Sequence, residues 1–191
     1  MARASGQPPS RPVELKRAGL SMEDAREVIR NVNTDTGVAM LLDMPDDQAA
    51  KILASYPSGA CSELIQGVAA ARPDKAGSVL RMLLTADAAR MMGYLKPDLS
   101  ASILATMPTE EAVRILGRTG VRTTAGIITK LPVEAFTPLT KAIPVRRTAE
   151  VLAFVQPDAA AALLLAAPDD ISRNILRELK PLFRAQVMRF L

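Results

Sequence analysis

The stretch PVRRTAEVLAFVQPDAAAALLLAAPDD, residues 144–170, contains the pattern that decides the fold of this chain. It contains two segments that each begin near a proline. Small or apolar residues follow each proline at the same spacing in both segments. The repeated positions are Thr148, Val151, Leu152 and Val155 in the first segment and Ala160, Leu163, Leu164 and Ala167 in the second. Intervals of three and four residues place side chains on one face of an α-helix. The stretch therefore predicts two short helices in succession.

Prolines mark the same pattern along most of the chain, and most of them lie 11 to 13 residues apart. They are Pro45, Pro57, Pro73, Pro97, Pro108, Pro132, Pro144, Pro157, Pro168 and Pro181. A proline disfavours helical geometry in the residue before it and lacks the N–H group that a continuing helix needs. Each proline therefore predicts a helix start, and the Asp or Thr that often follows is predicted to cap the new helix through its side-chain oxygen.

A repeated helix start implies a repeated unit, and a repeated unit implies a stack. The pattern predicts an all-α fold, an α-solenoid of about 14 short antiparallel helices over residues 21–191, because helices of 8 to 12 residues are not stable alone. Residues 1–20 contain several Gly, Pro and Ser residues and few large apolar ones. We expect them to form a flexible basic arm.

The composition argues against catalysis. The chain has no histidine and a single cysteine, Cys61, so the commonest general base, an internal disulfide and a cysteine-based zinc site are all excluded. Cys61 lies in line with apolar residues at helical spacing and is expected to be buried. The absence of tryptophan and the scarcity of other aromatic residues disfavour specific nucleic-acid binding. The sequence predicts a protein that is not an enzyme.

The charge of the chain is concentrated in the arm. The formal net charge is +4, and residues 1–20 hold four basic residues against one acidic residue. This distribution assigns the basic character to the arm rather than to a binding face of the body. The longest apolar run, residues 159–167, is far shorter than the roughly 20 residues of a membrane span. We expect no transmembrane segment and a cytoplasmic location.

Three pairs of adjacent carboxylates are the candidate metal ligands. They are Asp46 and Asp47, Glu110 and Glu111, and Asp169 and Asp170. Mg²⁺ could bridge such groups to a partner. The alternative interpretation is favoured, because all three pairs fall at predicted helix starts, where the helix dipole stabilises negative charge. The sequence predicts no cofactor, and Mg²⁺ is the one ion that remains a candidate.

The C-terminal residues are the candidate partner-binding surface. Arg173, Arg177 and Lys180 lie on one face of a predicted helix and form either a docking stripe for an acidic partner or a solvated face. The last predicted repeat ends in an apolar segment that contains Val187, Phe190 and Leu191. This segment either packs back into the stack, meets another chain or continues into a longer protein.

Three repeats carry a resemblance to a known family. Residues 45–53 (PDDQAAKIL), 108–116 (PTEEAVRIL) and 144–152 (PVRRTAEVL) resemble repeats of the cytosolic N-terminal domain of MgtE-type magnesium transporters. The resemblance covers about residues 35–191, and the flagellar motor protein FliG contains related short-helix repeats. It implies a right-handed superhelix and a regulatory domain that, in the transporter, precedes a CBS module and a membrane domain and binds Mg²⁺ between these parts.

Together these observations predict a non-catalytic protein-interaction or regulatory module, linked through the resemblance to magnesium homeostasis. Its partner would be another protein or a second copy of the chain. The alternative is a protein that binds an anionic polymer or a membrane surface through the basic arm.

Overall fold

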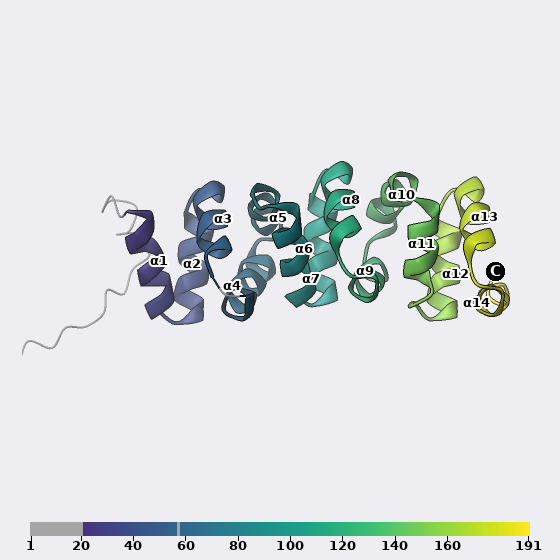
Figure 1. The fold of residues 1–191 in the computed structure, drawn as a ribbon, viewed down its shortest axis with the longest axis horizontal. Coiled ribbons are helices and arrows are strands. Elements are labelled where there is room, and N and C mark those ends of the chain that lie inside the picture. The colour runs from purple at the N-terminus through teal and green to yellow at the C-terminus, as the bar shows by residue number, and fades with distance from the viewer. Residues whose placement is uncertain (1–20, 57) are drawn as a thin grey trace, which may run out of the picture.

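The computed structural model describes residues 21–56 and 58–191, and within these ranges it contains fourteen α-helices and no strand (Figure 1). The helices are α1 (Met22–Asn31), α2 (Thr34–Asp43), α3 (Asp46–Ala54), α4 (Ser58–Ala71), α5 (Pro73–Met82), α6 (Thr85–Tyr94), α7 (Pro97–Thr106), α8 (Thr109–Arg118), α9 (Val121–Ile128), α10 (Val133–Ala142), α11 (Val145–Leu152), α12 (Pro157–Ala166), α13 (Asp169–Glu178) and α14 (Pro181–Val187). They form one elongated stack with α1 at one end and α14 at the other. The predicted all-α solenoid is confirmed.

The helices begin at a constant interval. The residues that precede the first turn, the N-caps, are Ser21, Asn33, Pro45, Arg72, Leu84, Lys96, Pro108, Gly120, Pro132, Pro144, Gln156, Pro168 and Lys180. The N-caps of consecutive helices lie 12 residues apart wherever both are described, and Pro45 and Arg72, which lie 27 residues apart, are the N-caps on either side of α4. Most units therefore consist of a helix of about ten residues and a two-residue connection.

The prolines act at these connections, but the predicted side-chain caps are wrong. Each described proline of the series is either an N-cap, as in Pro108, or the first helical residue, as in Pro97. The Asp or Thr that follows lies inside the first turn, and helices such as α3, α7 and α8 have no hydrogen bond from a capping side chain. Side-chain caps occur at Ser21 and Asn33, which precede the proline series.

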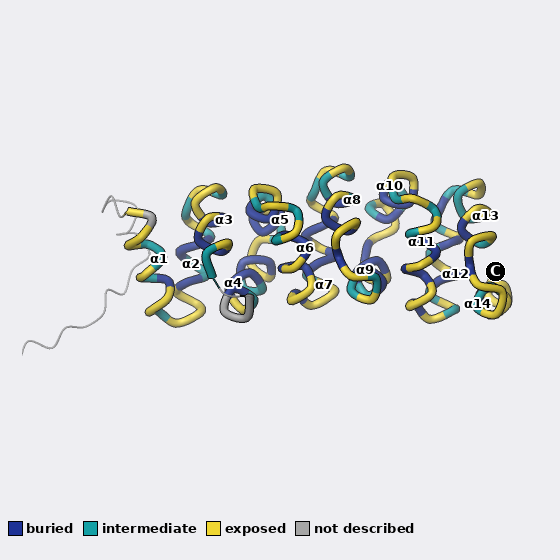
Figure 2. The backbone as a smooth tube through the Cα atoms, in the orientation of Figure 1, coloured by how far each residue is buried: buried dark blue, intermediate teal, exposed yellow. Residues whose placement is uncertain are grey.

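One set of positions faces inward in each unit. In α8 the fourth, seventh, eighth and eleventh residues after the N-cap are Ala112, Ile115, Leu116 and Thr119, and all four are buried. The same spacing gives Thr148, Val151, Leu152 and Val155 in the unit of α11, which confirms the periodicity predicted from the sequence. The fourth position is usually Ala, Ser or Thr, and these small side chains let neighbouring helices approach closely. The buried residues form a continuous band along the stack (Figure 2).

Each helix packs on the second helix after it. Contacts of this kind run through the whole stack, from α1 with α3 to α12 with α14. Side-chain hydrogen bonds follow the same rule. Thr34 Oγ1 in α2 donates to Glu63 in α4, and Thr137 Oγ1 in α10 donates to the carbonyl oxygen of Ala166 in α12. Arg147 in α11 donates to the carbonyl oxygen of Thr119, which lies in the connection just before α9. The odd-numbered helices thus form one layer and the even-numbered helices form a second. The right-handed twist of the superhelix and the antiparallel orientation of consecutive helices stay predictions.

The longest helix, α4, interrupts the constant interval without disturbing the inward face. It has 14 residues, and its buried side chains Cys61, Leu64, Ile65 and Val68 keep the same spacing. Its extra residues amount to nearly one helical turn, so they lengthen the helix while its inward side stays in place. Within the described residues, no helix is long and apolar enough to cross a membrane.

The set of inward-facing positions predicts which single substitutions lower the free energy of unfolding. Leu152 in α11 is completely buried, whereas Leu165 in α12 is 68% exposed. We expect Leu152→Ala to lower the free energy of unfolding by about 2–5 kcal/mol, because it removes buried apolar atoms and leaves a cavity. Leu165→Ala, the matched control, should change it by less than about 1 kcal/mol. Urea denaturation followed by circular dichroism measures both, and equal effects would contradict the register.

Candidate functional site

The three carboxylate pairs lie in the first turns of α3, α8 and α13, in separate parts of the stack. These helices are not packed on one another, because helix contacts in the stack link near neighbours. In the part of the chain that the structure describes, no three His, Cys, Asp or Glu side chains converge in a way that could hold a metal ion. Binding of Mg²⁺ to Asp46, Asp47, Glu110, Glu111, Asp169 or Asp170 remains a prediction that needs ligands from elsewhere.

Asp46 is part of an ion pair between two helices. The ammonium group of Lys75, in the first turn of α5, lies 2.5 Å from Asp46 Oδ1 and 2.5 Å from the carbonyl oxygen of Met44. Lys75 is almost completely buried, and Asp46 is about one-third exposed. A buried ammonium group is stable only when opposite charge and acceptors surround it. The sequence did not single out Lys75, because its partner lies 29 residues away.

Asp47 and the residues of the two other acidic pairs make local contacts that suit a helix start. Asp47 pairs with Lys51 at 3.6 Å on the surface of α3, and Glu111 pairs with Arg114 on α8. The Nε atom of Arg173 donates a hydrogen bond of 3.2 Å to the backbone oxygen of Asp169. Acidic side chains in a first turn also interact favourably with the helix dipole. The contacts of Asp47 and Glu111 support the structural interpretation of their two pairs, whereas the contact at Asp169 involves only its backbone.

Cys61 and Asp74 are among the groups whose pKa values are shifted, and the causes of both shifts are simple. Burial raises the pKa of the Cys61 thiol, so that less of the reactive thiolate is present at neutral pH. The hydrogen bond from Arg72 lowers the pKa of the exposed Asp74 carboxyl. The burial of Cys61 confirms the expectation that it is a core residue.

A narrow apolar pocket opens between α8, α9, α10 and α11. Its walls include Val113, Ile128, Phe136, Ile143 and Val151, and its volume is about 60 Å³. The polar residues in its lining are already engaged. Arg147 donates to the backbone oxygen of Thr119 at 2.7 Å, and the hydroxyl groups of Thr124, Thr140 and Thr148 donate to backbone oxygens of their own helices. The lining of the pocket is therefore mainly apolar.

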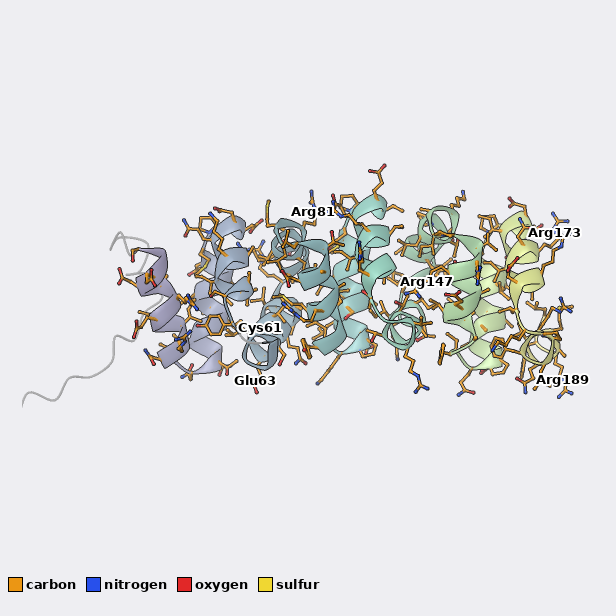
Figure 3. All side chains as sticks on the ribbon, viewed as in Figure 1. Cys61, Glu63, Arg81, Arg147, Arg173 and Arg189 are labelled. Carbon is orange, nitrogen blue, oxygen red and sulfur yellow. The ribbon has the colours of Figure 1, made fainter. Side chains whose placement is uncertain are left out.

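The α13–α14 end of the stack carries a concentration of positive charge. Its five basic residues, here called the basic end, are Arg173, Arg177, Lys180, Arg184 and Arg189. Residues 169–191 contain three acidic residues as well, which gives a net charge of +2. Arg173, Arg177 and Lys180 are exposed, and Figure 3 shows Arg173 and Arg189 extending outward at this end. Positive charge is thus present on the body as well as in the arm.

Large apolar side chains are exposed beside this charge. Leu182 is 78% exposed, and Met188, Phe190 and Leu191 are each about half exposed. Val187 differs from the other predicted contact residues, because it is completely buried and belongs to the core of the stack. A count of charged and apolar residues for each helix would have found Leu182, Arg184 and Arg189, which the sequence analysis did not select.

Comparison with known proteins supports the resemblance deduced from the repeats. Residues 101–191 match the family described as the MgtE intracellular N domain. The match covers α8 to α14 completely and includes the pocket, the basic end and its exposed apolar residues. No curated protein and no solved structure matches the chain. The C-terminal half of this solenoid is therefore similar to the intracellular domain of the MgtE family.

Substitution of Asp46 or Asp47 in α3 tests whether the ion pair between Lys75 and Asp46 stabilises the fold. We expect Asp46→Asn to lower the free energy of unfolding by about 1–3 kcal/mol, because buried Lys75 keeps the carbonyl oxygen of Met44 but loses its opposite charge. Asp47→Asn, the matched control, should change it by less than about 1 kcal/mol, since its pair with Lys51 is exposed. Chemical denaturation measures both variants. Equal losses would show that the Lys75 pair does not join α3 to α5.

Proposed function

We propose that this chain is a non-catalytic, cytoplasmic protein-interaction and regulatory module that acts in magnesium homeostasis. The observation that carries the proposal is the match of residues 101–191 to the MgtE intracellular N domain. The geometry agrees with a binding role, because the described residues present a regular stack with an apolar pocket and exposed charged and apolar side chains.

The α13–α14 end is the surface that we assign to partner binding. It combines exposed Leu182 and Phe190 with exposed Arg173, Arg177 and Lys180. Protein interfaces commonly join an apolar centre to a polar rim in which arginine is enriched. Exposed apolar residues grouped in this way are typical of interaction sites. Mg²⁺ would act at this surface only if a partner supplied further oxygen ligands.

The proposal is tested in host cells that lack the gene for this chain. We expect the loss to change total cell magnesium when external magnesium is varied, as measured by atomic emission. The variant Leu182→Ser/Phe190→Ser should reproduce the loss, because it makes the proposed contact surface polar at two side chains that are more than half exposed. Leu84→Ser is the control, since Leu84 is as exposed as Leu182 but lies in the middle of the stack. Unchanged magnesium content in the deleted cells would refute the link to magnesium.

A second candidate function is the binding of an anionic polymer or membrane surface. It is favoured by the four basic residues among residues 1–20. These residues lie outside the described part of the chain, so the assignment of an arm rests on the sequence alone. Basic residues next to an anionic membrane each contribute about 1 kcal/mol at low salt.

The second candidate makes a separate prediction for anionic vesicles. If the arm drives binding, deletion of residues 1–20 should abolish co-sedimentation with phosphatidylserine vesicles, whereas Arg173→Glu/Arg177→Glu should leave most of it. Neutral phosphatidylcholine vesicles provide the control. Retention of binding after the deletion would remove the arm from this role, and absence of binding by the full chain would remove the candidate itself.

A further inference from the structure

The pocket between α8, α9, α10 and α11 joins an apolar interior to a positive charge. Among the described residues that line it, Arg147 is the charged one. The side chain of Arg147 is 26% exposed, so it reaches from the wall of the pocket to solvent. Figure 3 shows Arg147 in the middle of the stack, away from Arg173 and Arg189 at its end. The pocket therefore has the two properties that an amphipathic anion requires, an apolar cavity and a cation beside it.

The guanidinium group of Arg147 has more N–H donors than its contacts within the described residues use. An arginine has five N–H groups, and the hydrogen bond to the carbonyl oxygen of Thr119 takes one of them at 2.7 Å. The ion pair with Glu150 is long, 3.8 Å, and Glu150 is half exposed, so solvent weakens this attraction. Arginine typically holds a carboxylate through two parallel N–H···O bonds. Arg147 therefore has the donors to bind one.

The pocket also borders the N-terminus of α11. Pro144, the N-cap of this helix, and Arg147 and Thr148 belong to the lining. The first N–H groups of a helix have no partners within the helix, and the helix dipole is positive there, so this end attracts anions. The first turn of α11 holds Arg146 and Arg147 and no acidic residue, whereas α8 and α13 each carry two carboxylates at this point. An anion beside α11 would therefore meet positive potential that carboxylates offset at those other helix starts.

The volume of the pocket limits the apolar part of a ligand. An apolar cavity of about 150 Å³ holds benzene, which corresponds to about 25 Å³ for each carbon atom. The pocket has a volume of about 60 Å³ and therefore holds roughly two or three carbon atoms. Its walls, such as Val113, Ile128 and Val151, favour aliphatic carbon, because its transfer from water to an apolar surface is favourable. The ligand that fits has a short aliphatic chain.

We propose that this pocket binds a short aliphatic carboxylate. The carboxylate lies on the guanidinium group of Arg147 at the N-terminus of α11, and the chain fills the apolar space between α8, α9, α10 and α11. This site goes beyond the proposed function, because the described lining residues all lie outside α13 and α14, the surface assigned to partner binding. A bound ligand would contact all four helices, so binding stabilises the middle of the stack.

A series of three small ligands tests the proposal with the full chain. Butyrate is the probe, because it joins a propyl group to a carboxylate. Butyramide keeps the propyl group without the charge, and acetate keeps the charge without a chain that fills the pocket. Titrations followed by ¹H–¹³C NMR of the methyl groups of Val113, Ile128 and Val151 measure the three dissociation constants. We expect butyrate to bind about tenfold or more tightly than either control, because only butyrate uses both parts of the site.

Substitution of Arg147 tests its role as the cation of the site. We expect Arg147→Gln to weaken butyrate binding about tenfold, to near the affinity of the wild type for butyramide, because it removes the charge. Arg146→Gln is the matched control, since the side chain of Arg146 is 85% exposed and lies outside the lining. It should bind butyrate like the wild type.

Substitution of Gly117 tests the apolar part of the site without touching Arg147. Gly117 lines the pocket, and a Cβ atom added there meets nothing within 4 Å. Gly117→Leu should therefore fold normally and weaken butyrate binding about tenfold, because the new side chain takes up space at the pocket. Gly93→Leu is the control, because Gly93 is the equivalent residue of α6 and an added Cβ there is equally free of contacts. Circular dichroism confirms that each variant is folded.

Three results would overturn the inference. Wild-type methyl signals that show no saturable change with butyrate exclude the site, and equal affinities for butyrate and butyramide exclude Arg147 as the group that selects the ligand. Undiminished butyrate binding by folded Gly117→Leu excludes this pocket. These comparisons still decide if Arg147→Gln fails to fold. Each negative result leaves the proposed function standing, because the effect of Leu182→Ser/Phe190→Ser on cell magnesium does not depend on the pocket.

Discussion

The fixed 12-residue interval between helix starts is the constraint on which the rest of this structure depends. Ten helical residues and two extended residues bring each unit back to the same orientation, so that the same four positions always face the interior. A proline at the N-cap or first helical position favours this arrangement, because its fixed backbone angle suits a helix start and its missing N–H has no partner there in any case. The apolar band, the two layers and the exposed ends all follow from this repeat.

The helix starts and the inward positions could be predicted from the sequence because both depend on local spacing. Even Pro138, which the spacing left out of the series, lies inside α10 rather than at a helix start. The side-chain caps were predicted wrongly, since proline shifts the following Asp or Thr into the first turn. The pair of Lys75 with Asp46 could not be predicted, because it requires knowing that α5 packs on α3.

The candidate surfaces were predictable to a smaller extent. Arg173, Arg177 and Lys180 are exposed, as both interpretations of their helix face required, and Phe190 and Leu191, for which the sequence left packing into the stack open, are about half exposed. Val187 is buried, since it falls on the seventh position after Lys180, where the repeat directs side chains inward. The net charge of the whole chain hides the five basic residues at the α13–α14 end, so the charge of a solenoid is best analysed helix by helix.

The length of α4 indicates which insertions and deletions such a protein can tolerate. Its additional turn leaves Cys61, Leu64, Ile65 and Val68 in the common arrangement, so growth by about one turn is compatible with an unchanged interior. Growth by one or two residues would instead rotate every later inward side chain toward solvent. Insertions and deletions in this architecture should therefore survive in natural variants only in steps close to three or four residues within a helix, or to twelve for a whole unit.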